Sequence, residues 1–153
     1  MEIATLSPPV KNGMQRGDKS MILLDTHVLI WLDEANPRLG SEAIKRIDRA
    51  FHSGSTIISA ISFWEIGTLI GKGRIRMDMD LAVWRNDFLE QGLIEIPVTG
   101  DISITAAGLE NFHGDTADRL IAATALKNSA LLLTADERLL GSGLVTQSLD
   151  ARI

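Results

Sequence analysis

The stretch Met21–Trp31, MILLDTHVLIW, decides the fold, because an apolar run of four residues ends abruptly in Asp25. A short, uninterrupted apolar run indicates a strand buried on both faces, as in a parallel sheet, although a buried helix has the same pattern. If residues 21–24 form the first central strand, Asp25 lies at the carboxyl edge of the sheet, where open α/β sheets bind ligands. The plainer alternative is that Asp25 only caps the helix that follows.

The overall composition limits the classes of protein to which the chain can belong. Its 153 residues suit one domain with a full core. The net charge of −5 and pI of 5.1 provide no general basic field for nucleic acid, so a polyanion would need a local patch or metal ions. The absence of cysteine excludes disulfides, thiolate zinc sites and Cys nucleophiles, and it fits a reducing cytoplasm. No apolar window reaches the roughly 20 residues of a membrane span, so no membrane partner is expected.

The first twenty residues differ in character from the rest of the chain. They contain Pro8-Pro9, Gly13 and Gly17 and show no apolar period. This composition predicts a disordered leader at residues 1–20, followed by a single domain at residues 21–153.

Within that domain, apolar strand patterns alternate with helical ones. Such alternation predicts a three-layer α/β/α domain with a central, mostly parallel sheet of four to five strands and right-handed crossovers. The expected strands are residues 21–24, 56–59, 93–96, 131–133 and 144–145. The expected helices are residues 27–32, 41–53, 62–70, 81–91, 101–109, 115–127 and 135–140.

Acidic residues stand where strands or loops lead into helices, at Asp25, Glu65, Asp118 and Asp136. Taken singly, most have a local explanation: Glu65 fits a capping box with Ser62, and Asp136 fits a helix cap. Because the strand ends of a parallel sheet share one edge, we expect these acids to converge. Converging carboxylates repel each other unless cations neutralise them, and oxygen ligands alone favour Mg²⁺ or Mn²⁺.

Four ordered segments resemble PIN-domain proteins, most closely the VapC-type toxins of bacterial toxin–antitoxin pairs. The resemblance covers residues 21 to about 145, and no single motif in it is specific, whereas the ordered set is. The segments are LDTHVLIW at 24–31, SFWEI at 62–66, DTADRLIAATA at 115–125 and LTAD at 133–136.

The resemblance implies an endoribonuclease that cleaves RNA phosphodiesters with water activated by Mg²⁺ or Mn²⁺. Asp25, Glu65, Asp118 and Asp136 match the four acidic positions of the family and would be catalytic residues and metal ligands. The resemblance also implies an RNA substrate, an antitoxin partner, a homodimer and a cytoplasmic location.

Four further residues are auxiliary candidates. Many relatives have Asp-Pro-Phe-Asp where this chain has Asp115-Thr116-Ala117-Asp118, so Asp115 is either a fifth acid or a cap. Thr26 and Thr134 could bind water or phosphate, and Arg119 could contact the RNA backbone.

Two rival functions remain open from the sequence. One is a non-catalytic PIN-like module that binds RNA or protein. The other is a phosphoaspartyl phosphatase or receiver-type domain, although the phosphatase pattern requires a second Asp where this chain has His27. The three tryptophans, Trp31, Trp64 and Trp84, lie in apolar patterns and are expected in the core.

Overall fold

A computed structural model describes residues 20–112, 114–143, 145 and 147–153. Residues 1–19 of the predicted leader lie outside this part of the chain, as do His113 and Leu144. Five parallel strands form one sheet in the order β3-β2-β1-β4-β5. The strands are β1 (Ile22–Leu24), β2 (Thr56–Ser59), β3 (Ile94–Ile96), β4 (Leu131–Thr134) and β5 (Ser148–Asp150).

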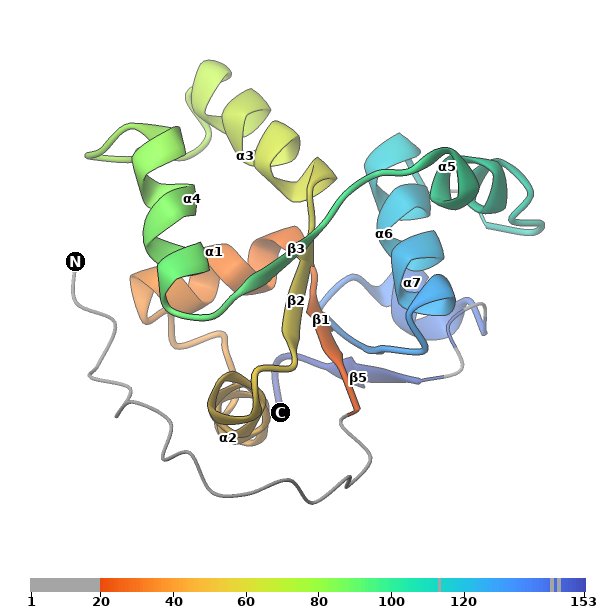
Figure 1. Cartoon of the computed structure of the whole chain (residues 1–153), viewed down its shortest axis with the longest axis horizontal. Coiled ribbons are helices and arrows are strands. Elements are labelled where there is room, and N and C mark those ends of the chain that lie inside the picture. Colours follow the sequence, from red (N-terminus) through yellow and green to blue (C-terminus); the bar gives the residue numbers. More distant parts are fainter. Residues whose placement is uncertain (1–19, 113, 144, 146) are drawn as a thin grey trace.

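Helices cover both faces of this sheet, which confirms the predicted three-layer α/β/α fold (Figure 1). The strand order reverses after β3, so the connections on either side of that point return over opposite faces. One face carries α1 (Thr26–Glu34), α2 (Ser41–Ser53), α3 (Ile61–Gly71) and α4 (Leu81–Glu90). The other carries α5 (Gly100–Ala107), α6 (Thr116–Lys127) and α7 (Glu137–Gly141).

The central strand β1 contributes to a hydrophobic core on each face. Leu24 packs in the core beneath α1 and α2, whereas Leu23 packs in the core beneath α6 and α7. Its neighbours follow the same alternation, because Leu23 is in register with Ile57 and Leu132, which belong to the same core as Leu23. Apolar residues at consecutive positions are therefore required, as a sheet buried on both faces demands.

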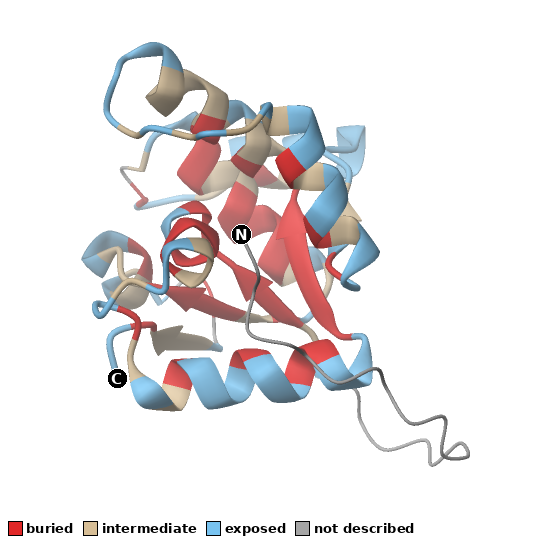
Figure 2. Cartoon of the chain, turned by 90° about the vertical axis from the view of Figure 1, so that its left-hand side faces the viewer, coloured by how far each residue is buried: buried red, intermediate tan, exposed pale blue. Residues whose placement is uncertain are grey.

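Helix α2 shows how the sequence pattern sets the outer layer. Ala43, Ile47 and Ala50 recur at helical spacing and are buried, while the intervening residues are largely exposed (Figure 2). The helix ends at Gly54, whose φ of 67° is in the left-handed region that glycine adopts without strain.

Two local expectations were wrong. The last strand is β5 at Ser148–Asp150, whereas Val145 of the expected strand packs in the core beneath α6 and Leu144 lies outside the described residues. Trp31 and Trp84 are buried as expected, but the Trp64 side chain on α3 is 63% exposed. Within the described residues, no helix has the length and apolar character needed to cross a membrane.

The C-terminal residues close the amino end of α2. The backbone N–H groups of Glu42 and Ala43 each donate to the Ile153 carbonyl oxygen over 3.1 Å. These are amides that a helix cannot satisfy internally, and the N-cap residue Gly40 has no side chain to accept them. A Cβ atom on Gly40 would lie 1.9 Å from the same carbonyl oxygen, so only glycine allows this approach.

We therefore expect Gly40→Ala to lower the free energy of unfolding by about 1–3 kcal/mol, because the added methyl displaces the backbone that closes α2. Gly71→Ala is the matched control: a Cβ there meets nothing within 4 Å, and the change should stabilise the helix by about 0.4–1 kcal/mol. Urea unfolding of both variants measures the two effects. Equal stabilities would contradict the tight contact at Gly40.

Candidate active site

Asp25 follows β1 directly and is the most buried acid of the cluster, with 5% of its surface exposed. As the N-cap of α1 it accepts a hydrogen bond from the Thr26 backbone N–H at 2.7 Å. Its second carboxylate oxygen accepts one from Thr134 Oγ1 at 2.7 Å, across the join between β1 and β4. Burial raises the pKa of Asp25, and the two hydrogen bonds oppose that rise.

Glu65 lies in α3 and faces the same rim, but it does not form the capping box that its sequence context suggested. Helix α3 begins at Ile61, and its N-cap has no side-chain hydrogen bond. Instead, Thr26 Oγ1 donates to Glu65 Oε1 at 2.5 Å and lies 2.8 Å from Ser62 Oγ. Burial raises the pKa of Glu65, and repulsion from Asp25 adds to the rise.

Asp118 lies in the first turn of α6, one turn after the N-cap residue Asp115. The Asp115 carboxylate accepts the Asp118 backbone N–H at 2.9 Å, so Asp115 is a cap by geometry. It is also an electrostatic member of the cluster: burial and then the charges of Asp115, Asp25 and Asp136 raise the pKa of Asp118 to about 7. The structure therefore shows Asp115 as a cap whose charge acts on Asp118, and a functional role as a fifth acid stays a prediction.

Asp136 caps α7 and lies beside an arginine that the sequence analysis did not single out. Its backbone N–H donates to Thr134 Oγ1 at 3.0 Å, so Thr134 links it to Asp25. The Arg138 guanidinium donates to Asp136 Oδ2 at 2.9 Å and to Asp118 Oδ2 at 3.1 Å. Hydrogen bonds from Arg138 hold the pKa of Asp136 below its ordinary value.

The auxiliary candidates have different places in this arrangement. Thr26 and Thr134 are buried and orient carboxylates of the cluster. Arg119 points elsewhere: its guanidinium donates to the four carbonyl oxygens of Ala106, Ala107, Leu109 and Phe112. These bonds tie the end of α5 to α6 and occupy most of the guanidinium donors, so the structure shows a structural role for Arg119, and its contact with RNA stays a prediction. His27 is exposed beside the cluster, where its charge lowers the pKa of Asp25 and Glu65.

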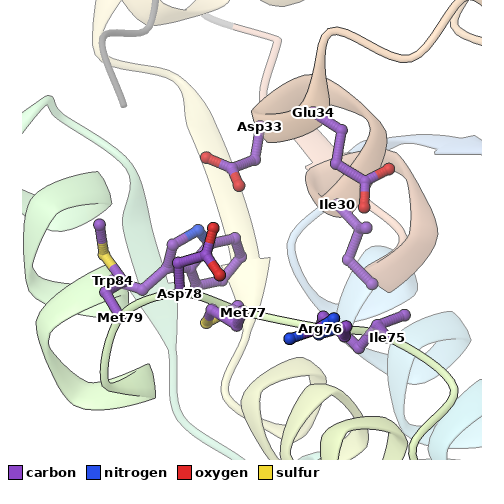
Figure 3. A pocket seen from close by; sticks show the side chains of 9 residues that line it. All are labelled: Ile30, Asp33, Glu34, Ile75, Arg76, Met77, Asp78, Met79 and Trp84. Carbon is purple, nitrogen blue, oxygen red and sulfur yellow. The ribbon is translucent and has the colours of Figure 1, made fainter.

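A separate pocket of about 210 Å³ lies between α1, α4 and the segment that joins α3 to α4 (Figure 3). None of the four candidate acids lines it. Burial raises the pKa of Asp33 at its edge, and the Trp84 indole opposes that rise. The two side chains do not meet hydrogen-bond geometry, so the buried indole N–H has no hydrogen-bond partner among the described residues.

The acidic cluster is chemically suited to a hard divalent cation. Among the described residues, no three acidic or histidine side chains converge closely enough to form a ready-made metal site. Mg²⁺ does not need one, because it keeps several waters and commonly binds through one or two carboxylates. The donors present are all oxygens, and burial together with repulsion from neighbouring acids raises the pKa of Asp118, so a nearby cation would stabilise its charged form.

Known proteins resemble this chain in sequence and in fold. The family described as PIN domain matches residues 22–141. Ribonuclease VapC22 of Mycobacterium tuberculosis is 34% identical over 119 residues, which cover 77% of this chain and 88% of that protein. The chain therefore belongs to the PIN domain family.

Solved structures show the same fold at low sequence identity. VapBC2 from Rickettsia felis, bound to a DNA fragment from its promoter, has a TM-score of 0.63 at 15% identity and covers 84% of this chain and 97% of that one. A toxin–antitoxin complex from Klebsiella pneumoniae has a TM-score of 0.59 at 20% identity, with 85% of this chain and 97% of that one covered.

The metal-free protein is expected to lose stability as the pH rises between about 4 and 7. Over this range the folded state retains a proton on Asp118 that the unfolded chain, with a pKa of 3.8, has released, so the free energy of unfolding falls. The raised pKa values of Asp25 and Glu65 act in the same direction. Urea unfolding in the presence of a chelator measures this, and Asp118→Asn should weaken the dependence. Identical pH profiles for the two proteins would contradict the assignment.

A second prediction concerns Arg119. Replacing it with Lys should lower the free energy of unfolding by about 1–3 kcal/mol, because an ammonium group cannot reproduce the planar fork that reaches several carbonyls. Arg46→Lys serves as the control: Arg46 forms an exposed helical pair with Glu42, and its change should stay within about 0.5 kcal/mol. Equal effects for the two substitutions would show that the Arg119 hydrogen bonds stabilise the fold no more than the exposed Arg46 pair does.

Proposed function

We propose that this protein is a divalent-metal-dependent endoribonuclease that acts as the toxin of a toxin–antitoxin pair. The observation that carries the proposal is the convergence of acids from four separate segments on one rim of the sheet. Asp25, Glu65, Asp118 and Asp136 act on one another through charge, although up to 111 residues of sequence separate them. The similarity to a named ribonuclease over most of the chain supports RNA as the substrate.

Asp25 and Asp118 are the residues that we expect to hold a Mg²⁺ or Mn²⁺ ion, with Glu65 and Asp136 completing the site through water. When bound, the ion would lower the pKa of a coordinated water and stabilise charge on the leaving oxygen of the phosphodiester. The protein's own contribution is orientation. Thr134 and the Thr26 backbone fix both oxygens of Asp25, and the Thr26 hydroxyl holds Glu65 towards the same rim.

The bound cation also explains how an acidic protein could act on RNA. With a net charge of −5, the chain repels a polyanion at long range. Positive charge placed among the rim carboxylates would reverse the local field where the phosphodiester must approach. The cluster would thereby provide the substrate contact as well as the chemistry.

The biological setting follows from the relatives and completes the proposal. The solved structures that share the fold include the toxin–antitoxin complex from Klebsiella pneumoniae. We therefore propose an antitoxin protein as partner, a homodimer as the assembled form and the cytoplasm as the location.

The proposal predicts that Asp25→Asn and Asp118→Asn each reduce Mn²⁺-dependent RNA cleavage by at least about 100-fold, because each removes a carboxylate that would hold the metal. Asp150→Asn is the matched control: Asp150 also ends a strand, but it pairs with Arg152 outside the cluster. Cleavage of a labelled RNA, with circular dichroism to verify folding, measures the effect.

The outcomes separate the rival functions. Full cleavage by both site variants would refute the assignment of the site. Intact RNA with the unaltered protein, and no change in melting temperature on adding Mn²⁺, would favour a non-catalytic binding module. Covalent labelling of Asp25 by acetyl phosphate would favour a phosphoaspartyl enzyme.

A further inference from the structure

Arg138 is the only described cation whose side chain bridges two of the candidate metal ligands. Its Nη2 lies 3.1 Å from Asp118 Oδ2 and 2.9 Å from Asp136 Oδ2. Its Nε donates to Asp136 Oδ1 at 3.2 Å. A single guanidinium therefore lies between a carboxylate on α6 and a carboxylate at the end of β4.

A similar pair elsewhere in the chain shows which part of this arrangement is local. Asp150 and Arg152 have the same spacing, and Arg152 also donates to its Asp through the backbone N–H, Nε and Nη2. The contact of Arg138 with Asp136 thus needs no special surroundings. Its reach to Asp118, 20 residues away in the sequence, has no counterpart at Arg152 among the acids of the rim.

We propose that Arg138 is a tethered cation that competes with the divalent metal for Asp118 and Asp136, so that metal binding requires its side chain to leave. This inference rests on the proposed function, because it concerns the same metal site. In the metal-free protein the guanidinium screens part of the repulsion among the carboxylates. Arg138 is then a positioning residue, which sets the affinity of the site for metal without contacting substrate.

The environment of Arg138 makes this exchange feasible. Its side chain is 58% exposed, whereas that of Asp118 is 10% exposed, so the arginine can move into solvent while the acid stays in place. Because the guanidinium itself lies largely in solvent, its ion pairs contribute little free energy, and displacing it costs little. A divalent ion carries twice the charge and interacts more strongly with the same carboxylates.

The inference is tested by titrating Mn²⁺ into the full-length protein without RNA, using calorimetry. Arg138→Gln should bind Mn²⁺ about five-fold more tightly, since removing the competitor releases about the free energy of one exposed ion pair. Arg138→Lys keeps the charge but lacks the fork that reaches two carboxylates, and its affinity should lie between the two. Arg152→Gln, which removes the similar local pair, should bind as the unaltered protein does.

Thermal unfolding provides a second readout that does not depend on catalysis. Without metal, Arg138→Gln should melt at a lower temperature than the unaltered protein, because the carboxylates lose their internal counter-charge. Saturating Mn²⁺ should then raise its melting temperature by more than it raises that of the unaltered protein. A loss that Mn²⁺ does not recover would show a purely structural role and overturn the inference.

The affinities distinguish failure of this inference from failure of the proposed function. Equal or weaker Mn²⁺ binding by Arg138→Gln would overturn the competition and leave the metal site standing. Absence of Mn²⁺ binding in all four proteins would refute the metal site, and the competition with it. Binding by Arg138→Gln alone would support the competition in its strongest form.

Discussion

The carboxylates at the rim of the sheet repel one another and thereby shift one another's pKa values. Burial raises the pKa of Glu65 and of Asp118, and the charge of Asp25 adds to the first shift while those of Asp115, Asp25 and Asp136 add to the second. Repulsion of this kind weakens the folded state, and it arises here because the chain places acids at the edge that the carboxyl ends of the parallel strands share. The layout of α1, α3, α6 and α7 is best understood as the means by which the chain tolerates that repulsion.

The helices offset part of this repulsion through their amino ends. Asp25, Asp115 and Asp136 are each the N-cap of a helix and accept backbone N–H groups there. A helix amino end carries partial positive charge, which offsets part of the cost of a nearby carboxylate. The capping role and the proposed metal-binding role are therefore compatible: capping holds the oxygens in place, and the remaining negative charge is what a cation would neutralise.

Much of the fold could be predicted from sequence because it depends on local patterns. The apolar run before Asp25 and the spacing of Ala43, Ile47 and Ala50 predict the central strand and an outer helix, and the structure contains both. The last strand was missed because Ser148–Asp150 has little apolar character, while the apolar Val145 ahead of it packs beneath α6.

The candidate site was only partly predictable. The convergence of the acids could be predicted from the topology alone, since the carboxyl ends of parallel strands share one edge of the sheet. The roles of Arg138 and Arg119 could not, because they depend on where a long side chain turns in three dimensions. One reaches Asp118, and the other reaches the carbonyls at the end of α5. Trp64 was misplaced for the opposite reason, since an apolar context does not show which face of α3 a residue occupies.

The shortness of β1 has a consequence for how the family can vary in length. Strand β1, whose side chains alternate between the two cores, is only three residues long. The Asp25 backbone N–H continues the strand pairing by donating to the Leu133 carbonyl oxygen. Inserting one residue just before Asp25 would either exchange the sides to which Leu23 and Leu24 point or turn the acid away from Thr134. Insertions and deletions should therefore accumulate in the loops at the amino ends of the strands, while the junction between β1 and α1 keeps a fixed length.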